Sequence, residues 1–468
     1  MKKYTQIIFS FLILLLIAEK NLFASTVERP PQYVLLAFDG SLNNEMWDET
    51  ISFAKNNNAK FSYFISGVYF LLNENRANYS EPTKGLGVSN IGFAGDSKTK
   101  LVDRVNYLNR AYDDGHTIGS HANGHFDGSE WSTSQWESEF QQFYNLIFNV
   151  YNQKGIEIQN YINPFHFNPE QIVGFRSPLL ATNKNLYSTL KKNNFSYDTS
   201  QTNDMDYWPH LDKGIWNFPL AELRIYGTGI QTLSMDYNFY VADSRGNPDP
   251  DNSELYRERM YKTYMAYFNS NYYGNRAPIH IGHHFSKWNK GAYWQAFMDF
   301  TKSVCMKPEV KCVGYQSLLE FMNSIDLSTR KEYQIGNFPK LSIPEIIKKD
   351  IAAIAPIEVS FLMKKINKEQ IELKLVGKDA KLFPKNSTYR WYIDDKEMFQ
   401  SKKTRINFSS FAKMKKSFKL SAVLENGKNK LIKTTHNISY NDYNDFTIQE
   451  EDLEKRALQG DLPEAHKD

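Results

Sequence analysis

Short apolar runs alternate with longer stretches of helical periodicity from residue 32 to about residue 323. Apolar runs of four to six residues bounded by polar residues are typical of buried strands. They predict strands over 33–38, 61–64, 117–120, 172–175 and 278–282. Helical spacing predicts helices over 100–114 and 134–151, the second beginning in a capping box of Ser134 and Glu137. Strands that alternate with helices favour an α/β fold with a largely parallel sheet.

The pattern changes after residue 355, where strand-length runs follow one another without helices between them. We expect strands over 358–363, 371–376, 389–393, 418–424 and 431–438, with a hairpin turn at 425–428. This pattern predicts a small all-β sandwich domain of Ig-like type over 356–440. Residues 326–355 are interpreted as a connector with some helix, and residues 441–468 as an acidic flexible tail.

The first residues have the pattern of a secretory signal peptide. Lys2 and Lys3 precede an apolar run over 7–18, and the small residue Ala24 ends a cleavage site. The run is shorter than the roughly 18 residues of a spanning helix, so we expect residues 1–24 to be removed and no stable membrane span to remain. The mature chain would be exported, to a bacterial periplasm or outside the cell. In such an oxidising compartment, Cys305 and Cys312 are expected to form a disulfide.

Charge is distributed unevenly along the chain, although the net charge is only +3. This balance gives no reason to expect a nucleic-acid partner. Residues 356–440 carry 19 Lys plus Arg against 8 Asp plus Glu, whereas residues 441–468 carry 3 against 9. The change in sign supports a boundary near residue 440.

A pair of histidines follows the predicted strand 117–120. The three residues between His121 and His125 allow both imidazoles to reach one ion from a tight loop. Neutral imidazole is a common zinc ligand, and a site with two His and one carboxylate keeps positions open for water and substrate. An H-x3-H pair alone is equally compatible with two ordinary loop histidines.

Other polar residues stand at or just after predicted strands, where α/β folds place their chemistry. Asp39 follows the first strand, Arg176 the fourth, and His283 the late one, while Asp198 lies in the segment Phe-Ser-Tyr-Asp-Thr-Ser. Taken singly, Asp39 could cap a turn, Arg176 could form a salt bridge and Asp198 could form an Asx-turn. Their joint occurrence with the His pair favours an active site.

These five segments resemble, in order, the five motifs of the polysaccharide deacetylase family (NodB type, carbohydrate esterase 4), over residues 32–325. The resemblance implies a distorted (β/α) barrel that holds a divalent metal, usually Zn²⁺. It implies Asp39, His121 and His125 as metal ligands. It also implies the catalytic residues Asp39 as base, Arg176 as the residue that orients the base, His283 as acid and Asp198 as the carboxylate that tunes His283. Ile281 would face the acetyl methyl group, and His284 is the second choice for the acid.

The first motif departs from the family pattern. Two adjacent aspartates are usual there, one as base and one on the metal, whereas Asp39 is followed by Gly40. Asp39 is then either the base, with water or a distant carboxylate such as Asp127 on the metal, or the ligand, with a base from elsewhere. We favour the metal role because two His alone bind an ion poorly. A second departure is Leu179, where an aromatic residue is frequent.

The resemblance implies hydrolysis of N-acetyl groups on an amino-sugar polymer. Because an exported enzyme first meets the cell wall, peptidoglycan N-acetylglucosamine is the leading substrate, ahead of other acetylated glycans. The tryptophans that could stack on sugar rings, or equally fill the core, are Trp208, Trp216, Trp288 and Trp294. The alternatives are a degenerate sugar-binding protein, an O-acetyl esterase on another glycan, and an adhesin defined by the β domain.

Overall fold

The computed structural model describes residues 27–156, 164–228 and 230–354, and eight shorter segments of the C-terminal module: 360–367, 370–376, 388–393, 396–401, 405–407, 417–426, 430–440 and 446–450. The expected signal peptide, residues 1–24, lies outside these residues. Within them, every helix is either too short or too polar to cross a lipid bilayer.

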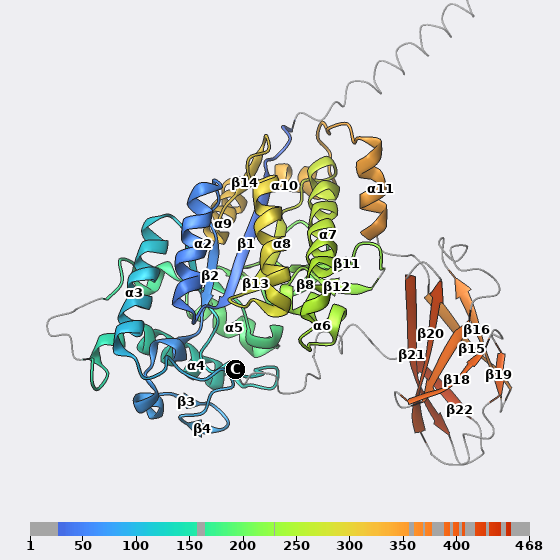
Figure 1. The fold of residues 1–468 in the computed structure, drawn as a ribbon, viewed down its shortest axis with the longest axis horizontal. Helices are drawn as coiled ribbons and strands as arrows, with labels where there is room; N and C mark the ends of the chain where they lie inside the picture. Colours follow the sequence, from blue (N-terminus) through green and yellow to red (C-terminus); the bar gives the residue numbers. More distant parts are fainter. Residues whose placement is uncertain are drawn as a thin grey trace, which may run out of the picture.

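A curled, mainly parallel sheet forms the centre of the first module (Figure 1). Its strands are, in order, β13 (Ile279–His284), β1 (Gln32–Gly40), β2 (Ser62–Ile65), β5 (Thr117–Ser120), β6 (Gly174–Phe175), β7 (Tyr197–Asp198), β10 (Ile215–Asn217) and β9 (His210–Asp212), with β14 (Val310–Cys312) also pairing with β1. All pairs are parallel except β9 with β10. The parallel α/β sheet predicted from the sequence is confirmed, as an open half-barrel rather than a closed one.

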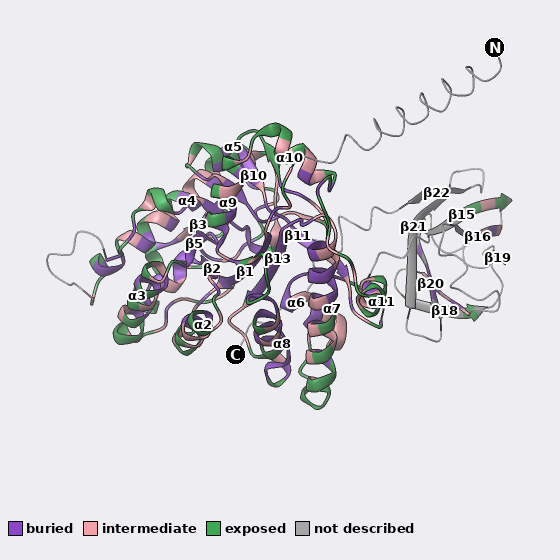
Figure 2. Cartoon of the chain, turned by 90° about the horizontal axis from the view of Figure 1, so that it is seen from above, coloured by how far each residue is buried: buried purple, intermediate pink, exposed green. Residues whose placement is uncertain are grey.

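Helices pack around this sheet. In chain order they are α2 (Asn44–Asn56), α3 (Lys98–Asp113), α4 (Thr133–Phe148), α5 (Lys184–Lys192), α6 (Asp236–Ser244), α7 (Ser253–Tyr273), α8 (Trp288–Val304) and α9 (Tyr315–Ser324). Buried residues are concentrated on the strands and on the helix faces that meet them (Figure 2). A side sheet of β12 (Gln231–Leu233), β11 (Leu220–Arg224) and β8 (Thr202–Asp204) lies beside β13, joined by a bridge between Met235 and Gly282. A short hairpin joins β3 (Ser80–Glu81) and β4 (Gly85–Leu86).

Several predicted element ends move in the structure. The first three predicted strands coincide with β1, β2 and β5 to within about two residues, whereas β6 has only two residues and β13 continues to His284. The capping box predicted for Ser134 and Glu137 is wrong. The box is formed by Ser132 and Gln135, because Ser132 has the extended backbone conformation of an N-cap residue and Gln135 follows it by three positions.

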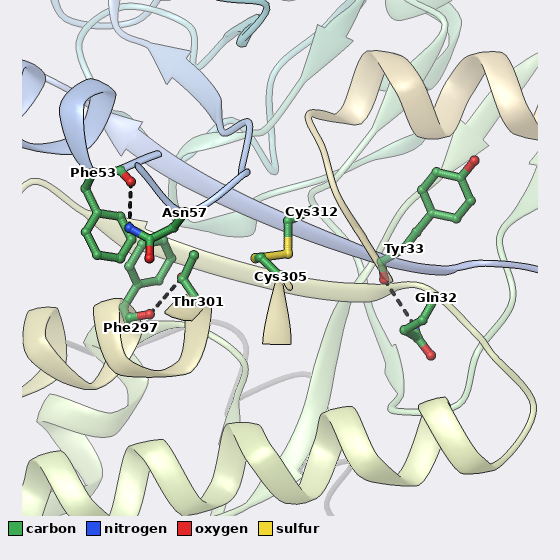
Figure 3. Close-up of a disulfide and its surroundings, with 8 residues drawn as sticks. All are labelled: Gln32, Tyr33, Phe53, Asn57, Phe297, Thr301, Cys305 and Cys312. Atoms are coloured by element: carbon green, nitrogen blue, oxygen red, sulfur yellow. Dashed lines mark hydrogen bonds between the residues drawn. A yellow bond between two sulfur atoms is a disulfide. The ribbon is translucent and has the colours of Figure 1, made fainter. Parts of the chain in front are cut away.

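The predicted disulfide between Cys305 and Cys312 is confirmed, with a Cα–Cα distance of 5.4 Å. Cys305 caps α8 and Cys312 ends β14, which pairs with the first half of β1 (Figure 3). The bond therefore ties a covering helix to β14, the strand that pairs with the first residues of β1.

The segment expected to be a connector contains two helices, α10 (Leu327–Gln334) and α11 (Glu345–Ile354). Helix α11 packs against α7, and Asp350 accepts a hydrogen bond of 2.8 Å from the Tyr226 hydroxyl of the first module. Tyr333 and Ile354 are buried in that module's core. The described part of this segment is therefore folded onto the first module.

The C-terminal module consists of two antiparallel sheets in its described residues. One has the order β15 (Ser360–Asn367), β16 (Gln370–Val376), β19 (Arg405–Asn407). The other has the order β18 (Lys396–Ser401), β17 (Tyr389–Ile393), β20 (Ser417–Asn426), β21 (Lys430–Tyr440), β22 (Phe446–Glu450). The predicted hairpin is present, because Asn426 pairs with Lys430. The prediction of a flexible tail is wrong for 446–450, where the alternating sequence Phe-Thr-Ile-Gln-Glu pairs with β21. An Ig-like topology stays a prediction.

Candidate active site

Asp39 stands near the carboxyl end of β1 and is buried, with 4% of its surface exposed. It is in register with His284 of β13 on one side and with Phe64 of β2 on the other. Residues in register on neighbouring strands present their side chains on the same face of a sheet. The structure therefore brings Asp39 and His284, not Asp39 and His283, onto one face.

The chain leaves β1 in a left-handed turn at Gly40, whose φ is +82°. A Cβ added there would lie 3.3 Å from Cε2 of Tyr69. A second carboxylate at this position would meet both an unfavourable backbone conformation and a neighbouring ring. At the position where the family pattern has its second aspartate, the backbone conformation and the neighbouring ring thus favour glycine.

Arg176 forms a buried ion pair with Asp39, and its Nη1 donates to Oδ1 of Asp39 over 2.8 Å. The Arg176 side chain has no exposed surface. Its Nε donates to Oγ1 of Thr199 over 2.9 Å, and the guanidinium lies over the ring of Phe64 at 4.6 Å. These three contacts fix the Arg176 guanidinium, which in turn holds the carboxylate of Asp39 in one orientation.

His121 and His125 lie side by side in the loop after β5, with ring centroids 5.2 Å apart. Nδ1 of His121 is 2.8 Å from the carbonyl oxygen of Arg176. Because a carbonyl only accepts, Nδ1 carries the proton and Nε2 keeps its lone pair. Burial lowers the pKa of His121, which favours this neutral form. His121 is therefore prepared to act as a ligand through Nε2.

The fit to a metal ion is partial. Among the described residues, no three His, Cys, Asp or Glu side chains form a group that could hold one. Asp39 instead pairs with Arg176, and Asp127, the alternative ligand considered from the sequence, is exposed and accepts from the backbone N–H of Ser129 at 2.9 Å. The predicted triad of Asp39, His121 and His125 is therefore not assembled in the part of the chain that the structure describes.

Asp236, at the start of α6, is shared by two histidines of β13. Nδ1 of His284 donates to its Oδ1 over 2.7 Å, and the backbone N–H of His284 donates to Oδ2 over 2.9 Å. Nδ1 of His283 lies 3.5 Å from the same Oδ2. His283 has no exposed side-chain surface and packs on Phe297, whereas 29% of the His284 side chain is exposed.

These surroundings shift the pKa values of the two imidazoles in opposite directions. Burial lowers the pKa of His283 to about 4, so this imidazole stays neutral at physiological pH. Burial also opposes charge on His284, but the charge and hydrogen bond of Asp236 outweigh it and raise the pKa of His284. In turn the two imidazoles lower the pKa of Asp236 against the effect of its burial. His284 is thus the histidine of the pair whose charged form is favoured and whose side chain reaches solvent.

Asp198, expected beside His283, has other partners. Its Oδ1 accepts from the Ser200 hydroxyl at 2.5 Å and its Oδ2 from Tyr187 at 3.2 Å. Burial raises its pKa to about 6. Within the described residues, the carboxylate that contacts the β13 histidines is Asp236. The expected pairing of Asp198 with His283 is therefore replaced by a pairing of Asp236 with both histidines.

Asp236 was not among the residues predicted from the sequence. A weak signal was present, because Asp236 follows the segment Gln-Thr-Leu-Ser-Met at 231–235 and precedes a helical stretch. The strand is short, and it belongs to the side sheet. Its proximity to His284 depends on the bridge between Met235 and Gly282, which local sequence does not reveal.

The four tryptophans divide into two groups. Trp208, Trp216 and Trp294 are at most 2% exposed and fill the core. Trp288 is partly exposed at the start of α8, with its ring centroid 5.7 Å from that of His284. Ile281, expected to face the acetyl methyl group, is fully buried in the main core cluster.

Aromatic rings support Trp288 from two sides. Tyr240 stacks on Trp288 with ring planes 3° apart and centroids 5.1 Å apart, and the partly exposed Tyr237 lies 5.4 Å from Trp288 and 6.3 Å from His284. The partly exposed rings beside His284 are therefore held in place by the packing of α6 against α8.

The family model of the polysaccharide deacetylases matches residues 26–158, a segment that contains Asp39, His121 and His125. The resemblance predicted from the sequence is thereby confirmed. No curated protein matches the chain.

The solved structures that match this chain do so at low identity. A candidate polysaccharide deacetylase from Mycobacterium smegmatis is 13% identical, with a TM-score of 0.41 and coverage of 68% of this chain and 99% of that chain. A chitin deacetylase from Colletotrichum lindemuthianum is 15% identical, with a TM-score of 0.32 and coverage of 62% and 90%. A carbohydrate esterase family 4 pseudoenzyme from Bacillus anthracis is 12% identical, with a TM-score of 0.32 and coverage of 62% and 66%.

Proposed function

We propose, from the match to the polysaccharide deacetylase family and from the two charge pairs on one face of the sheet, that this chain hydrolyses N-acetyl groups of an amino-sugar polymer. The observation that carries the proposal is the placement of Asp39, held by Arg176, in register with His284, held by Asp236. Amide hydrolysis needs a fixed base and a separate acid, and these two pairs supply them.

In the proposed reaction, Asp39 accepts a proton from the attacking water. Arg176 holds the Asp39 carboxylate in a fixed orientation, so the base does not have to be reorganised during the reaction. His284 donates the proton that the departing amine requires, since an unprotonated amine leaves poorly. Asp236 holds the tautomer of His284 in which Nδ1–H is bonded, so that Nε2 delivers the proton. The products are acetate and a free amino sugar.

His121 and His125 are the residues that would hold a divalent ion, with zinc as the expected metal and with water or substrate in the remaining positions. Such an ion, when bound, would polarise the acetyl carbonyl. Because most catalytic zinc sites have three protein ligands, a site with two is expected to bind the ion more weakly than the family pattern implies. In this assignment Asp39 is the base, not the ligand that the sequence analysis favoured.

The aromatic rings beside His284 favour a glycan as substrate. Trp288 and Tyr237 offer partly exposed ring faces next to the proposed acid, and such faces stack on the apolar faces of sugar rings. Export through the expected signal peptide would bring the enzyme to the cell wall. Peptidoglycan N-acetylglucosamine is therefore the proposed substrate, ahead of chitin-type oligomers and of O-acetyl esters on other glycans.

A sugar-binding protein without turnover is the second candidate. The observation that favours it is the lack, among the described residues, of a three-ligand metal group. One experiment separates the two candidates. The mature protein is incubated with N-acetylated peptidoglycan and with chitin oligomers, with and without added Zn²⁺, and released acetate is measured beside the metal content.

Release of acetate by the wild type, abolished when His121 and His125 are both replaced by Ala, is the expected result. Binding of the glycans without any release of acetate would favour the sugar-binding candidate. Wild-type metal content in the double Ala variant would overturn the assignment of these two ligands.

A further inference from the structure

The loop that carries His121 and His125 has a backbone that local sequence does not favour. Ala122 and His125 both have left-handed φ values, 53° and 59°, although neither is glycine. A left-handed conformation is unfavourable for a residue other than glycine and persists only where the surrounding structure fixes it. Something outside the loop must therefore hold these two positions.

A buried carboxylate on α4 supplies the contact at the middle of the loop. Oε1 of Glu139 accepts the backbone N–H of Asn123 over 3.0 Å, and the Glu139 carbonyl accepts from Nδ2 of Asn123 over 2.8 Å. Asn123 stands midway between His121 and His125. Glu139 is 1% exposed and Asn123 is fully buried, so water does not compete for these bonds.

Tyr79 completes the arrangement from the other side. Its hydroxyl donates to the carboxylate of Glu139, at 3.1 Å from Oε2 and 3.2 Å from Oε1. The same hydroxyl would lie 3.0 Å from a Cβ added at Gly124. Tyr79 therefore holds the Glu139 carboxylate and also packs against the loop backbone at Gly124.

Hydrogen bonds also hold the backbone of the loop at its two ends. The N–H of His121 donates to the carbonyl of Ile65, and the side-chain amide of Asn90 donates to the carbonyl of His125 over 3.0 Å.

Further hydrogen bonds reach the residues between the imidazoles. The backbone N–H groups of Gly67 and Asn90 donate to the carbonyls of Ala122 and Gly124, and the N–H of Ala122 donates to the hydroxyl of Ser120. Asn123, midway between the imidazoles, is the residue that Glu139 bonds through both its backbone and its side chain.

We propose that Tyr79 and Glu139 are positioning residues, which set the relative orientation of the His121 and His125 imidazoles through Asn123. The inference rests on the proposed function, since it assigns these residues to the same site. Partners that orient metal-binding side chains typically change metal affinity or activity by about 10- to 100-fold when they are replaced.

The test compares Glu139→Leu, Glu139→Gln and Tyr79→Phe with Gln153→Leu in the mature full-length chain. Gln153 is a matched control, because it is 6% exposed and makes four hydrogen bonds to residues 70–75 and Val150, away from the His loop. Three quantities are measured: the melting temperature, the imidazole NMR shifts of His-labelled protein, and the Kd for Zn²⁺.

In Glu139→Leu we expect the shifts of His121 and His125 to change and Zn²⁺ to bind about 10- to 100-fold more weakly. Glu139→Gln, whose amide oxygen still accepts from Asn123, should restore both, and Tyr79→Phe should lie between them. Gln153→Leu should lower the melting temperature without either change.

If acetate release is present in the wild type, kcat should fall in Glu139→Leu while KM is kept. Unchanged shifts and Zn²⁺ affinity in a folded Glu139→Leu protein would overturn the inference, as would equal changes in Gln153→Leu. Because the NMR shifts need neither metal nor substrate, they test the inference even if the wild type releases no acetate, which would contradict the proposed function alone.

Discussion

Asp39 and His284 are register partners on adjacent parallel strands, so their side chains emerge on the same face at the carboxyl edge of the sheet. Each is held from outside its own strand, Asp39 by Arg176 and His284 by Asp236. The proposed base and acid are thus placed by sheet register and oriented by their partners.

Asp39→Asn should lower kcat by about 100- to 10,000-fold, because an amide cannot accept the proton of the attacking water. Metal content should be unchanged if Asp39 is the base and not a ligand. Replacing the charge leaves Arg176 buried without its partner, so a loss of up to about 3–5 kcal/mol in the free energy of unfolding is also expected. Acetate release, elemental analysis and urea unfolding measure the three effects, and an empty metal site in a folded variant would restore the ligand role.

His284→Gln and His283→Gln should have opposite consequences. The first should lower kcat by about 100-fold or more and leave the melting temperature near that of the wild type, because His284 is partly exposed and is the proposed acid. The second should lower the melting temperature, because His283 is fully buried and its Nε2 contacts the Tyr264 hydroxyl at 3.3 Å. Acetate release that survives in His284→Gln would remove this residue from the mechanism.

Asp236→Asn should shift the alkaline limb of the kcat/KM profile to lower pH. The Asp236 carboxylate raises the pKa of His284, so the acid keeps its proton to higher pH in the wild type. Without that charge the imidazole loses its proton earlier as pH rises. Asp198→Asn is the control, since Asp198 contacts Ser200 and Tyr187 instead, and its alkaline limb should stay in place. A profile that moves in Asp198→Asn but not in Asp236→Asn would reverse the assignment.

Trp288→Ala should raise KM for a polymeric substrate by about 3- to 10-fold, the change expected for the loss of one aromatic stacking contact of about 1 kcal/mol. Turnover of a small aryl acetate should be unaffected, because such a substrate has no sugar ring to stack. Trp288→Phe should recover much of the polymer affinity. Equal losses on polymer and small ester would indicate that Trp288 supports α8 rather than the glycan.

Glu139 should make stability depend on pH. Burial raises the pKa of Glu139 to about 7 from an ordinary value near 4.5. The folded state therefore holds a proton that the unfolded state releases, and its stabilising effect is complete below about pH 4.5 and lost as pH rises through about 7. Between pH 4.5 and 8 the wild type should lose on the order of 3 kcal/mol relative to Glu139→Gln in urea unfolding. Parallel curves for the two proteins would show that Glu139 does not titrate in this range.

The sequence by itself determined the parallel α/β module, the positions of β1, β2 and β5, and the disulfide. A strand that is buried on both faces has a continuous apolar sequence, which can be recognised locally. The two cysteines are only seven residues apart, so their pairing can also be predicted from the local sequence. Asp39, His121 and Arg176 also lie at or just after strand ends, as the sequence predicts, whereas their roles stay a prediction.

Tertiary structure alone decided which of these side chains meet. Arg176 reaches Asp39 across 137 residues, and Asp236 reaches His284 across 48, through contacts that no local pattern encodes. Sheet register placed His284 rather than His283 on the face of Asp39, because one residue along a strand reverses the side-chain direction. The same packing buried three of the four tryptophans and left Trp288 beside the proposed acid. The sequence could not predict this division, because a tryptophan of the core and one of a binding surface are equally hydrophobic.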